Sequence, residues 1–485
     1  MATSEREDRM QRLGALRDAE VEPYPATTKR THTIRTVLAT FEMLLEQQSS
    51  VVIVGRIRAL RSHGKSAFIV VEDGEGSIQA YVKSDSIGDE AYALFEQFDV
   101  GDFVEVEGVC MRTKTEEPTV AVARIRLLTK ALRPLPEKWH GLTDSETRYR
   151  HRELDFIANP SVRGNLIRRA AIVAAMRDFF RERNFLEVDT PILQPIHGGA
   201  AARPFVTHHN ALDQDLYLRV APELYLKRMV VGGFERVFEF ARCFRNEGID
   251  RSHNPEFTQI EAYMAYASYI DLMELIEALF LKLSTEALPE PYVDLNDERI
   301  LLTPPFPRVR FRDVVLEHSG VDIANASDDD LRDGIIRAGQ HAESFWGRGK
   351  LLDELYKATA RPKLVQPTFL IDHPVELSPL AKRSPSDPSV VERFQLLIAG
   401  VEVVNAFSEL NDPIDQRERF EEQQSALDAG DEEATPIDEN YLSALEVGLP
   451  PTAGLGIGID RLVMLLTAAS NLKEVIAFPT LRRKE

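Results

Sequence analysis

The side chains best suited to chemistry gather between residues 244 and 266 of this 485-residue chain. Alternating apolar positions predict two strands around this stretch, at 236–244 and 257–266, joined by a polar loop. Its polar and aromatic side chains are Arg245, Glu247, His253, Asn254, Phe257, Glu261 and Tyr263. A cation, carboxylates and aromatic rings gathered on one sheet face predict a site that binds phosphates and carboxylates.

Strand alternation decides which of these side chains share a face. In the second strand, Phe257, Glu261 and Tyr263 lie on one face, whereas Ile260 and Ala262 lie on the other. A core face would not combine rings with a carboxylate. The alternative is an exposed, salt-bridged hairpin, which explains the charges but not the shared face of Phe257 and Tyr263.

A glycine-rich strand near the C-terminus is the second candidate element. Gly454, Gly456 and Gly458 alternate, so one face of the predicted strand carries no Cβ atoms. A flat ring or a phosphate chain could lie against that backbone. We expect Asp460 to cap the following helix and Arg461 to point back toward the strand end. The alternative is a strand lightened only for packing.

The third candidate element is the predicted strand at 402–409. Asn405, Phe407 and Glu409 alternate onto one face, and Glu402 is out of phase with them. A carboxylate such as Glu402 could hold Mg²⁺ against phosphates, because Mg²⁺ prefers hard oxygen ligands. A polar strand edge is the alternative.

Composition predicts a globular protein of two or three domains. The net charge of −20 argues against a general nucleic-acid coat but leaves local basic patches open. No apolar run is long enough to span a bilayer, and no signal peptide is visible, so no membrane is expected. The two cysteines build no disulfide framework, which fits a reducing cytoplasm.

Short alternating strands between residues 51 and 128 predict the first domain. Five are expected, at 51–54, 68–71, 78–82, 103–106 and 120–128, with a helix between the third and fourth. This pattern matches a five-stranded OB-fold barrel, a fold that binds single-stranded nucleic acid. We place N-terminal helices, the barrel at about 50–130 and a proline-containing linker in a domain spanning 1–145.

The second predicted domain spans 146–485 and is α+β, with a mixed, mainly antiparallel sheet flanked by helices. It opens with a helix at 166–180, where apolar residues recur at helical spacing. Residues 305–365 are expected to form a helical insertion.

These segments together resemble the three signature motifs of the class II aminoacyl-tRNA synthetases. The helix with 185–191 is similar to motif 1, the dimerisation element, 244–263 to motif 2 and 454–466 to motif 3. An N-terminal OB-fold before the catalytic domain is the layout of the lysyl, aspartyl and asparaginyl subclass. Local sequences resemble those of the bacterial lysyl-tRNA synthetases at 198–205, 221–227 and 373–382.

The resemblance implies that the amino acid is L-lysine, whose two ammonium groups need carboxylates. It assigns the α-ammonium to Glu223 with the Gly199 carbonyl, and the ε-ammonium to Glu409 and the Tyr263 hydroxyl, with Glu261 behind them. The implied lysine-binding residues are Gly199, Glu223, Glu261, Tyr263, Asn405, Phe407 and Glu409.

The resemblance likewise implies an ATP site. Its residues are Arg245, Glu247, His253, Asn254, Phe257, Glu402 and Arg461, of which Arg245 and Arg461 are catalytic together with Asn405. Phe257 and Arg461 sandwich the adenine, and Mg²⁺ on Glu402 neutralises the triphosphate. Where the family has a second metal-binding glutamate this chain has Gln395, so we expect weaker binding at one Mg²⁺ site.

The resemblance also implies partners. The barrel would bind the anticodon of tRNA(Lys) through Arg61, Phe68, Gln79 and Glu117, and the chain would form a homodimer through motif 1. Without the resemblance, Phe68 would be predicted to lie in the barrel core.

Three other functions remain open on sequence alone. One is a paralogue that attaches lysine to a protein, although such relatives lack an anticodon barrel. Another is an aspartyl or asparaginyl enzyme of the same subclass, which would want cationic or amide groups where Glu409 and Tyr263 stand. The third is a non-catalytic tRNA-binding protein, against which the complete set of polar site residues argues.

Overall fold

The computed structural model describes residues 2–136, 142–295, 297–344, 346–428, 430 and 434–483, and the side chains from residue 4 onward. Contacts divide the chain into two compact units, Met1–Thr143 and Asp144–Glu485. The predicted linker is described only as far as Pro136, because residues 137–141 lie outside the described residues. Among the residues that the structure describes, no helix is long and apolar enough to cross a membrane.

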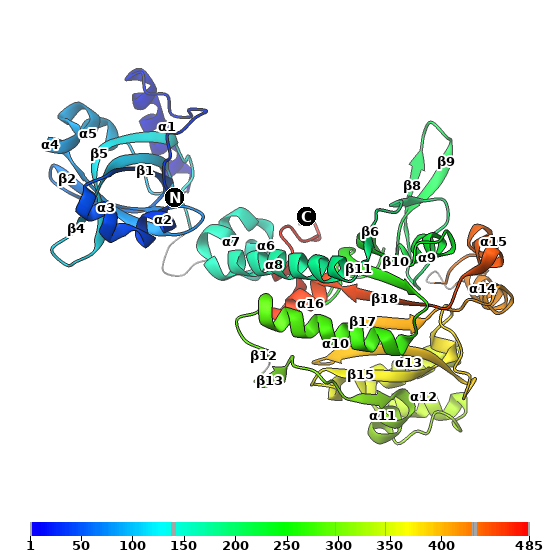
Figure 1. The fold of residues 1–485 in the computed structure, drawn as a ribbon. Coiled ribbons are helices and arrows are strands. Elements are labelled where there is room, and N and C mark those ends of the chain that lie inside the picture. Colours follow the sequence, from blue (N-terminus) through cyan, green and yellow to red (C-terminus); the bar gives the residue numbers. More distant parts are fainter. Residues whose placement is uncertain are drawn as a thin grey trace. The chain divides into compact units, whose positions relative to one another are not determined.

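The first unit is a closed barrel in the order β1-β2-β3-β5-β4, which confirms the predicted OB-fold (Figure 1). Its strands alternate buried and partly exposed residues, so one face of each strand forms the core. The strands are β1 (Ser50–His63), β2 (Ser66–Glu72), β3 (Ser77–Lys83), β4 (Phe103–Arg112) and β5 (Pro118–Thr129). The helices are α1 (Ala2–Asp18), α2 (Ile34–Ala39), α3 (Phe41–Gln47), α4 (Ser84–Ile87) and α5 (Asp89–Phe95).

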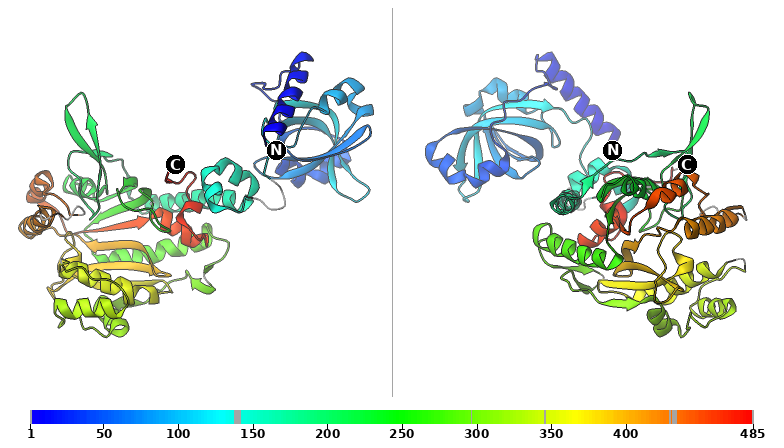
Figure 2. Two further views of the ribbon diagram at one scale, coloured as in Figure 1. Left: turned by 180° about the vertical axis from the view of Figure 1, so that it is seen from behind. Right: turned by 45° about the vertical axis from the view of Figure 1, so that its right-hand side comes forward.

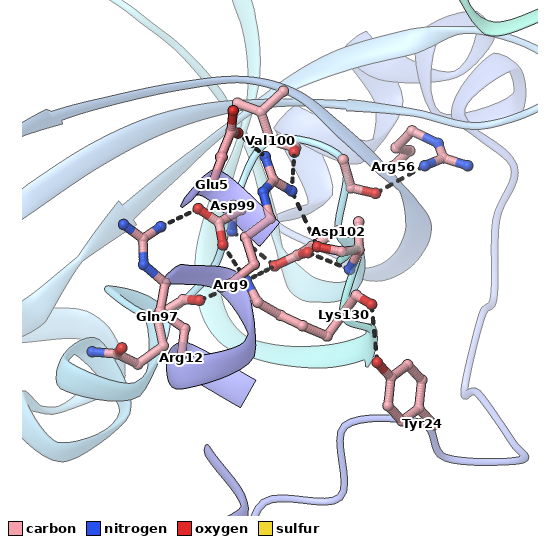
Figure 3. Close-up of polar contacts among 12 residues, drawn as sticks. Glu5, Arg9, Arg12, Tyr24, Arg56, Gln97, Asp99, Val100, Asp102 and Lys130 are labelled. Carbon is pink, nitrogen blue, oxygen red and sulfur yellow. Dashed lines mark hydrogen bonds and ion pairs between the residues drawn. The ribbon is translucent and has the colours of Figure 1, made fainter. Parts of the chain in front are cut away.

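A cluster of buried charged side chains connects α1 to the residues directly after β5, where the chain leaves the barrel (Figure 3). The fully buried Lys130 ammonium donates to Asp99 Oδ2 at 2.5 Å and to Asp102 Oδ2 at 2.8 Å. Arg9, on α1, donates to the carbonyls of Val100 and Ala131, each at 3.1 Å. The hydrogen bond from Arg9 to the Ala131 carbonyl therefore holds α1 against the residues that follow β5. The buried charges of the cluster are compensated because each has a polar partner.

The second unit is built on an eight-stranded mixed sheet in the order β14-β15-β16-β17-β18-β11-β10-β6. Only the β14–β15 and β10–β6 pairs are parallel, which confirms the predicted mainly antiparallel α+β fold. The strands are β6 (Leu186–Glu187), β10 (Arg236–Phe244), β11 (Glu256–Ala265), β14 (Arg308–Arg310), β15 (Thr368–Pro374), β16 (Val390–Ile398), β17 (Val401–Ser408) and β18 (Thr452–Gly458).

Two cores cover the two faces of this sheet. Ile260 and Ala262 of β11 pack against α8 (Pro160–Glu182), α10 (Tyr269–Glu286) and α16 (Ile459–Leu466). Tyr263 and Ala265 of the same strand pack instead against α9 (Glu223–Val231), α14 (Pro413–Asp428) and α15 (Glu439–Gly448). The alternation predicted for β11 is therefore present, and its polar face is the one turned away from α8 and α10.

The remaining elements surround this sheet. In segment 305–365, α11 (Phe311–Ser319), α12 (Asp328–Arg337) and α13 (Arg348–Thr359) form a third core, which also includes Leu370 of β15 and Leu397 of β16. The hairpin of β8 (Phe205–His209) and β9 (Gln214–Leu218) stands away from the sheet (Figure 2). The others are α6 (Ser145–Arg150), α7 (Arg152–Ala158), β7 (Leu193–Gln194), β12 (Tyr292–Leu295), β13 (Glu298–Leu301) and the 3₁₀ turns η1 (Arg361–Lys363), η2 (Val375–Leu377) and η3 (Leu472–Glu474).

Candidate active site

Antiparallel pairing brings the three candidate segments together. β18, the glycine strand, lies between β17 and β11. Gly454 pairs with Phe407 on one side and Tyr263 on the other, and Gly456 pairs with Asn405 and Glu261. Each glycine therefore separates two of the predicted site residues on the same sheet face.

This face borders a cavity of about 560 Å³. The predicted site residues that line it are Gly199, Glu223, Arg245, Glu247, His253, Asn254, Phe257, Glu261, Tyr263, Glu402, Asn405, Phe407 and Arg461. Glu409 and Gln395 are buried just outside the lining. Residues separated by more than 200 positions in sequence thus converge on one cavity.

The three glycines of β18 all line the cavity, but the free space above their backbone differs. A Cβ atom at Gly454 would overlap the Glu409 carboxylate and the Tyr263 ring, so the protein's own side chains fill that space. A Cβ atom at Gly456 would lie 3.8 Å from its nearest neighbour, the Glu261 Cγ, which is ordinary contact. A Cβ atom at Gly458 would lie 3.7 Å from the Arg461 side chain, which is also an ordinary contact. The backbone at Gly456 and Gly458 therefore has more free space above it than the backbone at Gly454.

Carboxylates dominate the end of the cavity near Gly454. Glu261 accepts hydrogen bonds from Gln259 Nε2 at 2.6 Å and from the Tyr263 hydroxyl at 2.9 Å. Burial, reinforced by the negative charge of Glu223, raises the pKa of Glu261 to about 8. Because the Tyr263 hydroxyl donates its hydrogen bond to Glu261, the lone pairs of the phenol oxygen remain free to accept from a cation in the cavity.

Lys227 is a site residue that the sequence analysis did not single out. Its ammonium lies 2.5 Å from Glu223 Oε1 and forms a second ion pair with Glu409 Oε2. Burial lowers the pKa of Lys227, but Glu223 and Glu409 more than offset this and leave the pKa above its usual value. The signal in the sequence was the four-residue spacing of Glu223 and Lys227, which suits an ion pair along a helix.

Cations and rings form the other end of the cavity. The Arg245 guanidinium lies 5.1 Å from the centre of the Phe257 ring. Arg461 Nη2 is 2.9 Å from His253 Nε2, and because a guanidinium can only donate, this nitrogen is the acceptor. His253 Nδ1 then carries the proton and lies 2.8 Å from Asp250 Oδ2. Asp250 was not predicted; it fixes the tautomer and orientation of His253.

The remaining polar residues at this end lie at its rim and at the β17 strand. Asn254 Nδ2 donates to the Glu256 carbonyl at 2.6 Å, and Glu247 lies in the exposed loop between β10 and β11. Arg393 was not predicted: its Nε donates to Asn405 Oδ1 at 2.8 Å and its Nη1 to Ser378 Oγ at 2.8 Å. The Asn405 amide nitrogen is thereby oriented away from Arg393, where it can donate to a ligand.

Asp460 does not cap the helix as predicted. The N-cap of α16 is Gly458, and Asp460 lies within the helix. Its Oδ2 accepts the Thr258 backbone N–H at 2.8 Å and its Oδ1 lies 2.5 Å from Arg169 Nη1. The carboxylate therefore ties α16 to β11 and to α8. The capping prediction failed because the Asp460 carboxylate binds Thr258 and Arg169, which are distant in sequence, and local sequence does not reveal such partners.

A β-bulge brings Glu402 into phase with Asn405. Val404 pairs with Leu396 but Glu402 pairs with Leu397, so β17 carries one extra residue, Val403, at this point. Glu402 and Asn405 both line the cavity as a result. Simple alternation would have placed them on opposite faces, as the sequence indicated.

The surroundings of Glu402 limit how a metal ion could bind. Gln395 Nε2 donates to Glu402 Oε2 at 2.7 Å. Within the described residues, no cluster of three or more His, Cys, Asp and Glu side chains suits a metal ion. A hard cation at Glu402 would therefore need oxygens from a ligand or water, which is the usual manner of Mg²⁺ bound with a nucleotide.

A second candidate surface lies on the barrel. Phe68 is half-buried on the outer face of β2, and its ring stacks on Tyr81 with centroids 4.6 Å apart, so the alternative of a core position is wrong. Arg61 pairs with Phe68 across the strands and is exposed. Tyr81 was not predicted; its position opposite Phe68 was the signal for it.

The other two predicted residues of this surface lie one step along the sheet. Gln79 accepts a hydrogen bond from Thr119 Oγ1 at 3.0 Å, so its amide nitrogen remains available. Glu117 is exposed in the turn before β5. The four predicted residues therefore come from three neighbouring strands and one adjoining turn.

Comparisons with known proteins agree over the whole chain. Residues 144–482 match the family model described as tRNA synthetases class II (D, K and N), and residues 51–128 match the OB-fold nucleic acid binding domain. A lysine–tRNA ligase from Moorella thermoacetica is 50% identical over 478 residues, covering 98% of this chain and 97% of the relative. One from Roseiflexus castenholzii is 50% identical over 482 residues, covering 99% of each.

The glycine strand yields a stability prediction. Gly454→Ala inserts a methyl group into space held by Glu409 and Tyr263, and such overpacking destabilises a protein by about 1–3 kcal/mol. Gly456→Ala, on the same face, meets only an ordinary contact and should leave the denaturant midpoint within experimental error or slightly raised. Equal midpoints for the two variants would contradict the packing described here.

Proposed function

The chain belongs to the lysine–tRNA ligases of the class II aminoacyl-tRNA synthetases, and we propose that it attaches L-lysine to tRNA(Lys) at this cavity. The observation that carries the proposal is the gathering of Glu223, Glu261 and Glu409 at one end of it. Carboxylates buried together bind cations, and lysine is the protein amino acid with a second ammonium group.

The proposed lysine pose follows from these carboxylates. The α-ammonium binds Glu223 and the Gly199 carbonyl, which adjoin each other because Gly199 packs against the Glu223 side chain. The ε-ammonium binds Glu409 and the Tyr263 hydroxyl, whose proton is already directed to Glu261. Phe407 packs beside the aliphatic chain, and the lysine carboxylate faces Arg245.

ATP occupies the other end of the cavity in this proposal. The adenine lies between Phe257 and Arg461, with Glu247 and Asn254 fixing its orientation or contacting the phosphates. His253 and Arg461, already paired in the structure, bind the γ-phosphate. Arg245 bridges the lysine carboxylate and the α-phosphate, and Asn405 donates to one of them from the position that Arg393 sets.

The reaction needs positioning and charge stabilisation rather than covalent participation by the protein. A lysine carboxylate oxygen attacks the α-phosphorus, the bond to the bridging oxygen breaks, and pyrophosphate leaves. The 3′-terminal hydroxyl of the tRNA then attacks the carbonyl carbon of lysyl-adenylate, and AMP leaves with the bonding pair. Arg245 stabilises the negative charge that develops on the α-phosphate.

We propose that Glu402 would hold the Mg²⁺ that accompanies ATP, and that this ion would supply charge neutralisation to the phosphates. Glu402 fits this role because it lines the cavity. Gln395 offers a neutral amide where a second carboxylate would add charge, and it already donates to Glu402.

The two units take separate roles in the proposal. The barrel unit, with the sequence-based limits 1–145, binds the unpaired anticodon, and the unit 146–485 is catalytic. Phe68 and Tyr81 stack on bases, Gln79 and Glu117 read base edges, and Arg61 contacts the backbone. The expected place of work is the cytoplasm, where translation takes place.

A homodimer through motif 1 is also proposed. Large apolar side chains are exposed on its elements: Ile167 on α8 is 68% exposed, and Leu186 on β6 is 48% exposed. Exposed large apolar side chains are typical of protein interfaces.

The activity is tested by lysine-dependent exchange of pyrophosphate into ATP, followed by charging of tRNA(Lys). Glu409→Gln should lower kcat/KM for lysine at least about 30-fold, because loss of one buried charge partner costs about 2–5 kcal/mol, while KM for ATP stays unchanged. Glu439→Gln, which removes a surface partner of Arg417, is the matched control. Exchange with aspartate or asparagine but not with lysine would overturn the specificity.

Anticodon stacking is tested by Phe68→Ala. We expect KM for tRNA(Lys) to rise about fivefold or more, since stacking of one base on an aromatic side chain is worth about 1–3 kcal/mol. Lysine-dependent exchange without tRNA should stay unchanged. Tyr24→Ala, at a partly exposed ring elsewhere in the same unit, is the control, and an effect of equal size from both variants would contradict the assignment.

The metal proposal is tested by Gln395→Glu. A second carboxylate beside Glu402 should lower the Mg²⁺ concentration that gives half-maximal exchange by several-fold, because the added charge favours the cation. Gln424→Glu is the matched control, because Gln424 also donates to a carboxylate, Asp428, at 2.8 Å but outside the cavity. Superimposable Mg²⁺ curves for wild type and Gln395→Glu would refute the proposal.

A further inference from the structure

Lys227 is a buried charge for which the proposed reaction has no use. It lies on α9, its side chain is 0% exposed, and it does not line the cavity. Its ammonium is nevertheless paired with Glu223 and Glu409, the carboxylates proposed for the two ammonium groups of the substrate. It also lies 5.3 Å from the centre of the Phe407 ring.

We propose that Lys227 is a positioning residue whose ammonium acts as a resident countercharge, orienting Glu223 and Glu409 and matching the charge of the cavity to an amino acid with two ammonium groups. The inference rests on the proposed lysine activation and adds a determinant of its specificity. Lys227 would act through the two carboxylates without touching the substrate.

The first argument is how the carboxylate oxygens are shared. The Lys227 ammonium forms ion pairs with Oε1 of Glu223 and Oε2 of Glu409. The other oxygen of Glu409 has no hydrogen-bond partner among the described residues and lies at Gly454, which does line the cavity. Glu223 lines the cavity directly. One lysine side chain thus leaves each carboxylate one oxygen for a ligand.

The second argument is the charge balance. When ionised, the carboxylates of Glu223, Glu261 and Glu409 carry three negative charges, and Lys227 neutralises one of them. Two remain, which equals the charge of the two ammonium groups of lysine. The substrate carboxylate is left to Arg245. An amino acid with a single ammonium group would leave a buried carboxylate without a partner, which is unfavourable.

The third argument concerns protonation. Glu261 and Tyr263 on β11 and Tyr441 on α15 face the same pair of carboxylates. Burial raises the pKa of Glu409 well above its usual value even though Lys227 lowers it. Without Lys227, the pKa values of Glu409 and Glu261 would rise further, because the positive charge of Lys227 lowers both. A protonated carboxyl group binds an ammonium weakly.

The test is the pH dependence of KM for lysine in pyrophosphate exchange between about pH 6.5 and 9. In the wild type this KM should fall as pH rises through about 8, because Glu261 ionises there and an ionised carboxylate favours the bound ammonium. In Lys227→Met, KM for lysine at pH 7 should be at least tenfold higher than in the wild type. The pH at which this KM decreases should be at least one pH unit higher. KM for ATP should not change.

Two further variants separate charge from packing. Lys227→Arg keeps the positive charge, so its KM for lysine should decrease at the same pH as in the wild type, even if the KM itself is higher. Lys282→Met is the matched control: Lys282 also pairs with two glutamates, Glu182 at 3.0 Å and Glu286 at 3.3 Å, but on α10 away from the cavity. A Lys227→Met profile that superimposes on the wild type would overturn the inference.

Should Lys227→Met not fold, the double variant with Glu409→Gln removes the opposing charge as well. Its pH profile should be displaced from that of Glu409→Gln alone, because Glu261 still loses the positive charge that lowers its pKa, and coincident profiles would overturn the inference. If the wild type shows no lysine-dependent exchange, the proposed function itself is wrong. The two failures are therefore distinct.

Discussion

The antiparallel register of β11, β18 and β17 is the constraint on which the rest of the catalytic unit depends. Backbone hydrogen bonds fix Gly454 between Phe407 and Tyr263, and Gly456 between Asn405 and Glu261. Because the central strand contributes only backbone on this face, side chains from its two neighbours reach across it. A slip of one residue would turn every one of these side chains into the core.

The end of the cavity near Gly454, where the proposal places the amino acid, contains buried carboxylates that folding alone would not favour. Glu261 and Glu409 are both buried there, and apart from the ion pair with Lys227 no described residue partners the Glu409 carboxylate. Uncompensated buried charge normally destabilises a fold. Here the Lys227 ammonium offsets part of this charge, and in the proposed function the ammonium groups of the substrate offset the remainder. A binding site that is incomplete without its ligand is a common reason for a local departure from good packing rules.

Sequence patterns predicted both folds and most of the site, because period-two alternation and glycine spacing depend on local geometry. Glu261 and Tyr263 are on the predicted face of β11. The patterns failed where tertiary contacts decide. Asp460 binds Thr258 and Arg169 instead of capping a helix, and Lys227 was not singled out because nothing in the local sequence shows that α9 turns it toward Glu409. The individual roles of the site carboxylates came from resemblance, because no spacing in a sequence distinguishes the partner of an α-ammonium from that of an ε-ammonium.

The extra residue at Val403 divides β17 into two halves with independent alternation. Glu402, Asn405 and Phe407 all line the cavity. In the proposed function, Glu402 lies in the half that faces the nucleotide, and the other two lie in the half that faces the amino acid. Substitutions in the second half can therefore reshape the amino-acid end without disturbing the alignment of the nucleotide end. A strand built in this way gives one catalytic frame two separately adjustable parts, so that a change of amino acid does not require a new way of holding ATP.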